Sequence, residues 1–259
     1  NLQKELDSDV TQQQQLHTDL EYELLPDVFP KVPGEEDIES RKTATVSDTH
    51  VYIRVDGIPY VLDDVPLSEW YAVYVSEMAD LGIISGYTDR DGRPIGQYGP
   101  SDNVTLAQLA KIAVVAAEVN QEKCPEHAWN PTASGSWASA YVSCAEHLHW
   151  EVYRPIESEE TEGPLAVDTN RAASLTEVVV TVLQAFGREF DEPTGQKFSD
   201  VSTDFSMAGA IEAAAADGIV SGYRDENGEE TGFFGPFDTV NRAETAKIVS
   251  LALDVYGGE

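Results

Sequence analysis

An internal duplication is the feature that most constrains how this chain folds. Residues 64–120 align with residues 200–256 without a gap, at an offset of 136, and 22 of the 57 aligned positions are identical. A repeat of this length indicates that one supersecondary unit has been copied and that the copies pack against one another. The matched pairs include Asp64/Asp200, Val65/Val201, Gly82/Gly218, Tyr87/Tyr223, Asp89/Asp225, Gly92/Gly228, Pro100/Pro236 and Lys111/Lys247.

A third, degraded copy fits between the two. The segment WASAYVSCAEHLHW, which begins at Trp137, follows the pattern of WYAVYVSEMADLGI from Trp70. Likewise SLTEVVVTVLQAFG from Ser174 follows TLAQLAKIAVVAAE from Thr105. The middle copy lacks the GYxD loop of the other two and has an acidic, turn-rich segment in its place. The sequence therefore predicts three tandem units.

Each unit has the pattern of two helices joined by a loop. Apolar residues recur at helical spacing after Trp70, and Gly82 is a stop signal for that helix. The second helix of the first unit is predicted to open near Thr105. In the third unit Asn241 is a good N-cap, and Glu244 three residues later completes a capping box. A mainly α-helical fold follows from this pattern.

The residues ahead of the repeats have a different character. Leucines at positions 2, 6, 16, 20 and 24 predict a polar helix, and an extended linker follows it. Alternating apolar residues around Asp56-Gly57 predict a β-hairpin. The predicted domains are an N-terminal extension (1–50), a hairpin (51–62), and three repeats (63–120, 121–190 and 191–259).

The charge balance argues against several kinds of partner. The chain has 47 acids and 16 bases, a formal net charge of −31. Nucleic acid and anionic membrane surfaces both require a basic footprint. No apolar run approaches the ~20 residues of a membrane span. The acidity itself is typical of a solvated surface, with tolerance of high salt or of cations as the alternative. Neither nucleic acid nor membrane insertion is therefore expected.

The repeated unit resembles the S-layer homology domain, a bacterial cell-surface module. The resemblance rests on the spacing of DV, GI, GY and GP and on the RAE element at Arg242–Glu244, and it covers about 195 of the 259 residues. It implies three helix-loop-helix repeats packed about a pseudo-threefold axis. It also implies noncovalent anchoring at the extracellular surface, by binding a secondary polymer attached to peptidoglycan in the grooves between modules.

The chemistry of the RAE element suits an anionic glycan. A helix N-terminus presents unpaired amides and a partial positive charge, and an arginine adds a planar fork for a carboxylate. Arg242 is the candidate charge contact, with a salt bridge to a neighbouring repeat as the structural alternative. The corresponding positions begin with Leu106 in the first repeat and Leu175 in the second, and Ser206 replaces the tryptophan in the third. Arg242 would therefore pair with a tryptophan from another repeat.

The candidate glycan-binding set extends beyond the arginine. Arg171 would compensate in the middle repeat only if its loop bends back, and the aromatic candidates have core packing as their alternative. The full set is Arg242, Asn241, Glu244, Trp70, Trp137, Tyr87, Tyr223 and Arg171.

Two other constellations have structural and functional interpretations. Cys124 and Cys144 would form a disulfide in an exported protein, the alternative being two buried thiols. Oxygen-bearing residues at alternate positions before a glycine resemble a calcium loop, although turn chemistry explains the same pattern. These candidate metal ligands are Asp89, Asp91, Asp225 and Asn227.

Catalysis has no support in the motifs. The sequence contains no G-x-S-x-G, H-E-x-x-H or Gly-rich phosphate loop, so we expect no enzyme and no cofactor other than calcium. The leading hypothesis is an anchor that binds a cell-wall glycan. The alternative is a structural or adhesive surface module that assembles by protein–protein contacts, with or without calcium, and the lost arginines favour it.

Overall fold

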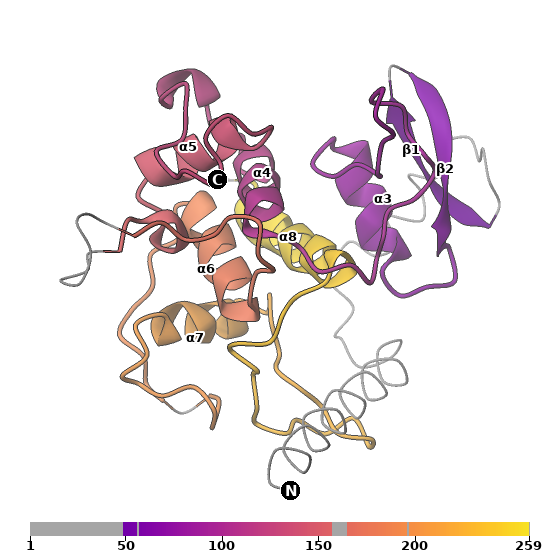
Figure 1. The fold of residues 1–259 in the computed structure, drawn as a ribbon. Helices are drawn as coiled ribbons and strands as arrows, with labels where there is room; N and C mark the ends of the chain where they lie inside the picture. The colour runs from indigo at the N-terminus through magenta and orange to yellow at the C-terminus, as the bar shows by residue number, and fades with distance from the viewer. Residues whose placement is uncertain (1–48, 56, 157–164, 196, 259) are drawn as a thin grey trace, which may run out of the picture.

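The computed structural model describes residues 49–55, 57–156, 165–195 and 197–258 (Figure 1). The polar helix predicted near the N-terminus lies outside the described residues. The predicted mainly helical fold with one short hairpin is confirmed. Its elements are β1 (His50–Val55), β2 (Ile58–Pro66), α3 (Ala72–Asp80), α4 (Leu106–Ala116), α5 (Ser139–His147), α6 (Leu175–Ala185), α7 (Ala208–Ala216) and α8 (Arg242–Tyr256), with 3-10 turns η1 (Gln121–Lys123) and η2 (Glu151–Tyr153).

The hairpin is part of the first repeat, although the sequence pattern placed it ahead of that repeat. β1 and β2 pair antiparallel, and Gly57 has the positive φ of 79° that a tight turn requires. β2 continues past the predicted end at residue 62 to Pro66, and Val65 near its end is buried in the core. Asp64 on this strand accepts hydrogen bonds from the backbone amides of Tyr98 and Gly99, at 2.8 and 2.7 Å. The hairpin and the loop of the first repeat therefore form one structure.

The inner helix of each repeat starts where its capping signal lies. Thr105, Ser174 and Asn241 are the N-caps of α4, α6 and α8, and all three helices have a complete capping box. The N-cap side chain accepts a hydrogen bond from the backbone amide three residues on. The side chain of that third residue accepts a hydrogen bond from the N-cap amide. The predicted starts near Thr105 and Asn241 are confirmed, and the middle repeat follows the same rule at Ser174.

A closed cycle of hydrogen bonds joins the segments before these three helices. The amide of Val104 donates to the carbonyl of Val240 (2.9 Å), that of Val240 donates to Ala173 (3.2 Å), and that of Ala173 donates to Val104 (2.8 Å). Each segment thus gives one bond to a neighbour and receives one from the other. This cycle is the centre of the pseudo-threefold arrangement, and the middle repeat is a full member of it.

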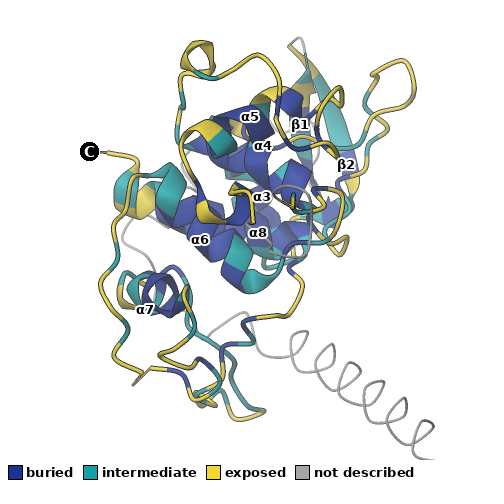
Figure 2. Cartoon of the chain, turned by 60° about the vertical axis from the view of Figure 1, so that its left-hand side comes forward, coloured by how far each residue is buried: buried dark blue, intermediate teal, exposed yellow. Residues whose placement is uncertain are grey.

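The helices of the three repeats are interleaved around this centre. α4, α6 and α8 contact one another, while α3 packs on α8, α5 on α4 and α7 on α6 (Figure 1). The faces of these inner helices are mostly buried (Figure 2). Each outer helix therefore packs on the inner helix of a different repeat. A single repeat has little of its own core, so the three depend on one another for stability.

The same exchange satisfies the amides at the start of each inner helix. In α8 the amide of Arg242 donates to the carbonyl of Asp102 (2.9 Å), and that of Ala243 donates to Pro100 (3.1 Å). Both acceptors belong to the first repeat. The equivalent bonds are Leu106 to Arg171, Ala107 to Thr169, Leu175 to Asp238, and Thr176 to Pro236.

Two glycines of the third repeat give a matched test of the loop packing. A Cβ on Gly235 (φ 74°) would lie 2.1 Å from Asp238 Oδ2, whereas one on Gly218 (φ 78°) would meet nothing within 4 Å. Because the backbone strain is alike, at about 1 kcal/mol, the difference isolates the steric clash. We expect Gly235→Ala to lower the free energy of unfolding by about 2 kcal/mol more than Gly218→Ala. Equal effects in denaturant titrations would show that the loop relaxes freely.

Candidate functional site

Arg242 is held at the junction of the first and third repeats. It is the first residue of α8 and is only 8% exposed. Its Nε donates to the carbonyl of Tyr98 (2.7 Å) and its Nη2 to that of Ser85 (3.0 Å). The guanidinium carbon lies 4.4 Å from the ring centroid of Tyr98 and 4.9 Å from that of Tyr87. The neighbouring repeat thus holds Arg242 through carbonyls and aromatic rings, and the salt bridge considered from the sequence is not the contact observed.

Two tyrosines of the first repeat complete this setting. Tyr98 is buried, and its hydroxyl donates to the carbonyl of Arg242 at 2.9 Å. Tyr87 is half-buried, and its hydroxyl donates to Asp102 Oδ2 at 2.8 Å. Burial raises the pKa of both hydroxyls, and the bond to Asp102 raises that of Tyr87 further. Both tyrosines therefore stay neutral and act as donors at physiological pH.

The nitrogen available for a ligand is Nη1 of Arg242. Nη1 makes no hydrogen bond to a described residue. It is also not one of the fully buried side-chain nitrogens or oxygens that lack a hydrogen-bond partner. The backbone amides at this helix start are, in contrast, already paired: two bind carbonyls of the first repeat, and that of Glu244 binds Asn241 Oδ1 at 2.8 Å. The expectation of unpaired amides here was therefore wrong, because the adjacent loop caps the helix.

A second basic side chain lies on α8, beside two aromatic rings of the first repeat. The Nζ of Lys247 lies 5.6 Å from the ring centroid of Trp70 and 5.9 Å from that of Tyr74. Trp70 is half-buried just before α3, which packs on α8. Trp70 of the first repeat and Arg242 of the third therefore belong to one junction. Lys247 was not predicted to be a site residue; its identity with Lys111, at the aligned position of the first repeat, was the available signal.

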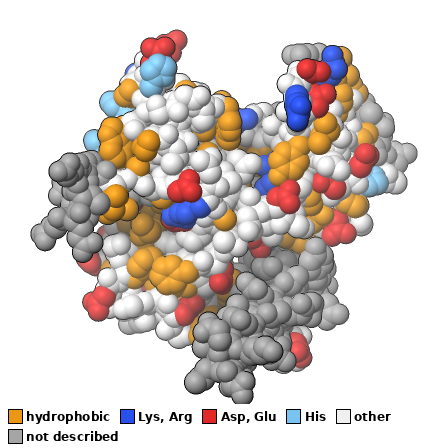
Figure 3. All heavy atoms as spheres, viewed as in Figure 1, with side chains coloured by type: hydrophobic (Ala, Val, Ile, Leu, Met, Phe, Trp, Pro, Cys, Tyr) orange, Lys and Arg blue, Asp and Glu red, His pale blue; other side chains and the backbone are white. Residues whose placement is uncertain are grey.

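The surface is hollowed where these elements meet. In Figure 3 a notch separates the lobe of β1, β2 and α3 from the lobe of α4 and α5, and in Figure 1 α8 runs between the two lobes. The functional candidates Asn241 and Glu244 shape this helix start, since the amide of Asn241 donates to Glu244 Oε2 at 2.9 Å.

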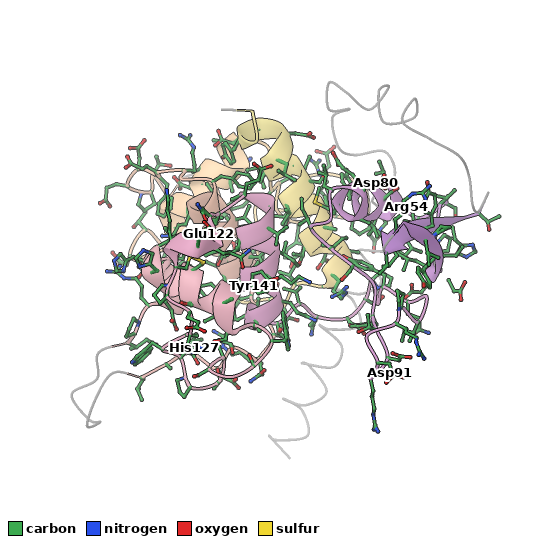
Figure 4. The ribbon with its side chains drawn as sticks, turned by 90° about the horizontal axis from the view of Figure 1, so that it is seen from above. Arg54, Asp80, Asp91, Glu122, His127 and Tyr141 are labelled. Atoms are coloured by element: carbon green, nitrogen blue, oxygen red, sulfur yellow. A yellow bond between two sulfur atoms is a disulfide. The ribbon has the colours of Figure 1, made fainter. Side chains whose placement is uncertain are left out.

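The junction of the middle repeat with α4 has related chemistry. Trp137 is 61% exposed, so the core alternative does not describe it. Trp137 precedes α5, and Tyr141, labelled in Figure 4, lies on that helix and packs partly against the core. The hydroxyl of buried Tyr153 donates to the carbonyl of Leu106 at 2.8 Å, which reproduces the bond from Tyr98 to Arg242. The sequence did not reveal Tyr153, because the middle loop has a different length and composition.

The junction of the third repeat with α6 has no basic side chain at the positions of Arg242 and Lys247, where Leu175 and Val180 stand. Tyr223 keeps the loop contact, its hydroxyl donating to Asp238 Oδ2 at 2.9 Å. The Nη1 and Nη2 of Arg171 both bind the carboxylate of Glu177, the first at 2.8 Å. The loop does bring Arg171 to a helix start, but its fork is already occupied by a carboxylate of the protein.

The two Asp-rich loops are organised as turns. Asp89 Oδ1 accepts the amides of Asp91 and Arg93, each at 2.9 Å, and Asp225 Oδ1 accepts those of Asn227 and Glu229 at the same distance. Within the described part of the chain no cluster of three or more His, Cys, Asp or Glu side chains could hold a metal ion. Calcium binding remains a prediction, and a chelator-reversible rise in melting temperature would test it.

Cys124 and Cys144 form a disulfide, as predicted, with their Cα atoms 5.0 Å apart. The bond ties the segment after α4 to α5 and is typical of proteins that fold in oxidising compartments. No helix in the described part of the chain is both long and apolar enough to cross a membrane.

Three interleaved helix pairs, joined by the hydrogen-bond cycle before α4, α6 and α8, define a helical repeat module. The candidate site of this module lies between two repeats. The S-layer homology domain model matches residues 62–110 and 197–246. The chain thus carries two S-layer homology domains, one in its first and one in its third repeat. Domains of this family anchor proteins noncovalently to cell-wall polymers at the cell surface, and they are binding modules without catalytic function. No curated protein matches the sequence.

Proposed function

We propose that this chain anchors noncovalently to a bacterial cell wall by binding an anionic glycan at the junction between the first repeat and α8. The observation that carries the proposal is the setting of Arg242. Two carbonyls and two aromatic rings fix its guanidinium, and Nη1 has no hydrogen bond among the described residues. A pre-positioned guanidinium loses little conformational entropy when an anion binds.

The neighbouring side chains suit a sugar acid. Lys247 supplies a second basic group on the same helix, although burial lowers its pKa to about 7. The half-buried ring of Trp70 offers an apolar surface for a sugar face. This local cationic site can operate in a chain with a net charge of −31, because charges beyond about 10 Å are largely screened by salt. The proposed ligand is a secondary polymer linked to peptidoglycan, and no catalytic step is part of the proposal.

Protein–protein assembly is the second candidate function, and one observation favours it. At the junction of the third repeat with α6, the ring centroids of Phe205 and Phe237 are 5.6 Å apart, and Phe237 is 76% exposed. The exposed ring of Phe237, at a junction that has no basic residue at the positions of Arg242 and Lys247, suits a protein surface better than an anionic polymer. Assembly predicts a molecular size that increases with concentration in solution.

Cosedimentation with purified sacculi tests the anchor, using the two structurally corresponding tryptophans. We expect Trp70→Ala to weaken binding by about tenfold, or about 1.4 kcal/mol, because its ring lies beside Lys247 at the proposed site. Trp137→Ala is the matched control, since Leu106 occupies the arginine position at its junction. Acid stripping of the secondary polymer should abolish binding by the parent chain. Binding that survives stripping would exclude this ligand, and failure to bind intact sacculi would favour assembly.

A further inference from the structure

Two positions that are polar in the first repeat have become aromatic in the third. Phe237 aligns with Ser101, which is exposed in the first repeat. Phe205 aligns with Glu69. Because the first repeat folds with polar side chains at these positions, the fold does not require the two rings. Exposed aromatic side chains are, in contrast, a common feature of interaction surfaces.

The two rings are held against each other, and one of them faces solvent. Phe205 lies just before α7, is half-buried and packs against the core. The ring of Phe237 lies against that of Phe205, with their centroids 5.6 Å apart and their planes tilted by 59°, yet Phe237 is mostly exposed. A partner therefore meets an aromatic face that packing has already positioned, so binding orders few additional side chains.

An acid stands next to each ring. Asp204 precedes Phe205, Asp238 follows Phe237, and both acids are exposed. We call these four residues the aromatic–acidic surface. It combines an apolar face with negative charge, whereas the junction of Arg242 combines aromatic rings with positive charge.

The third repeat around this surface is also acidic. Residues 191–241 contain 11 acids and two bases. Both bases lie beside the same acid, because Nζ of Lys197 is 3.7 Å and Nη2 of Arg224 is 3.3 Å from the carboxylate of Glu230. The electrostatic potential here favours a positively charged partner.

The same charges argue against a second copy of this chain as the partner. In a symmetric dimer each surface meets itself, so Asp204 and Asp238 would approach their own counterparts. Like charges brought together in this way oppose association, and the net charge of −31 on each chain adds to the repulsion. A basic partner has neither disadvantage.

We infer that the aromatic–acidic surface binds a basic segment of another protein, in which arginine or lysine side chains flank apolar ones. A guanidinium or ammonium group can lie over the exposed face of Phe237 and interact with the carboxylates of Asp204 and Asp238. A neighbouring apolar side chain of the segment would cover the ring and remove it from water. This inference rests on the second candidate function, protein–protein contact, and does not depend on the glycan anchor.

Fluorescence anisotropy of a defined peptide, titrated with the full chain, tests the inference. The probe is a synthetic peptide in which arginine alternates with leucine, and a second peptide has serine in place of each leucine. We expect Phe237→Ser, which installs the residue of the first repeat, to weaken binding of the probe by about tenfold, because the exposed ring face is lost. The serine peptide should bind the parent more weakly and distinguish less between parent and variant. Trp137→Ala removes an exposed aromatic ring of the middle repeat and should bind the probe as the parent does.

A charge variant tests the electrostatic part. Asp204→Asn is the suitable change, since the carboxylate of Asp238 also holds the hydroxyl of Tyr223. The variant should bind the probe more weakly than the parent at low salt and should depend less on salt. At an ionic strength of about 1 M, where the screening length is about 3 Å, the two should bind alike. Binding by the parent that does not weaken with salt would overturn the requirement for a basic partner.

The other outcomes separate the possible occupants. Equal binding of the probe by the parent and Phe237→Ser overturns the inference. If sedimentation velocity shows that the parent self-associates while Phe237→Ser stays monomeric, the surface belongs to a second copy, which overturns the inference and leaves the second candidate function in place. If Phe237→Ser loses sacculus binding and keeps probe binding, the surface belongs to the wall polymer, and the inference is overturned as well. Failure of the parent to bind sacculi would remove the anchor alone, because the probe contains no glycan.

Discussion

Replacing Arg242 with methionine is expected to lower the free energy of unfolding by about 3 kcal/mol, since bonds from a charged donor contribute about 1.5 to 3 kcal/mol each. The substitution leaves the carbonyls of Tyr98 and Ser85 without their donor and removes the cation from between two rings. Because these contacts join two repeats, the loss of stability should appear in the cooperative unfolding of all three repeats. Thermal and urea denaturation measure it, with a fall in Tm of about 6 to 12 °C.

Two variants make this result interpretable. Arg242→Lys keeps the charge but not the planar fork, so it should recover only part of the stability. Arg54→Met removes an exposed arginine that lies 5.4 Å from the ring centroid of Tyr52, and should cost less than about 0.5 kcal/mol. If Arg242→Met were as mild as Arg54→Met, Arg242 would not contribute to the junction in the way its contacts indicate.

Arg242 has structural contacts in addition to its proposed role in binding, and this determines which binding experiments are informative. A variant that lost both stability and sacculus binding would not distinguish the loss of a ligand contact from weaker packing between the repeats. The proposed ligand contacts of Trp70 and Lys247 are more separable, because each has a counterpart in another repeat: Trp137 on the approach to α5, and Val180 on α6. The internal repeats thus supply the controls for the anchor hypothesis.

Local structure was largely predictable from the sequence, for identifiable physical reasons. The starts of α4 and α8 follow from Thr105 and Asn241, whose side chains bind the amides three residues on. Gly57 specifies the hairpin turn through its positive φ. Each of these signals acts over a few residues, so it can be read without knowledge of the tertiary fold.

The pairing of repeats was not predictable in the same way. Nothing in the sequence of α3 indicates that it packs on α8 in place of α4, since either helix offers an apolar face of similar character. The role of Arg242 depended on that pairing, because its partners Tyr98 and Ser85 lie about 150 residues earlier in the chain. Tyr153 was missed because it comes from a loop without sequence similarity to that of Tyr98, although both hydroxyls bind the first carbonyl of an inner helix.

Loss of the disulfide between Cys124 and Cys144 is expected to lower the free energy of unfolding by roughly 3 kcal/mol, the chain-entropy value for a loop of this length. The bond spans 20 residues of the middle repeat, the one with the most altered loop. Cys144 is buried on α5, so alanine is the suitable replacement at both positions. Denaturation of Cys124→Ala/Cys144→Ala, beside the parent with and without reductant, measures the effect.

The segment that follows Cys124 is connected by hydrogen bonds to the start of α4. Next to the disulfide, the carbonyl of Pro125 accepts the hydroxyl of Ser143 at 2.6 Å. Further along, Asn130 Nδ2 donates to the carbonyl of Val167 (2.8 Å), and the hydroxyls of Thr132 and Thr169 lie 2.8 Å apart. The carbonyl of Thr169 in turn caps α4 through Ala107. Through these hydrogen bonds the disulfide supports the start of α4, which belongs to the first repeat.

Because of this connection, the location of the amides that lose protection from hydrogen exchange is a second measurement of the disulfide's role. Hydrogen exchange should increase first at the hydrogen-bonded amides of Ala128, Trp129 and Asn130. It should increase next at Leu106 and Ala107, whose amides donate to carbonyls of the middle loop. The amides of Arg242 and Ala243 are the internal control, because the loop that caps them belongs to the first repeat. A loss of protection spread equally over both helix starts, or a stability change that reductant fails to reproduce in the parent, would contradict this account. In that case the bond would act on the ring as a whole, and the middle loop would not be the path by which it stabilises α4.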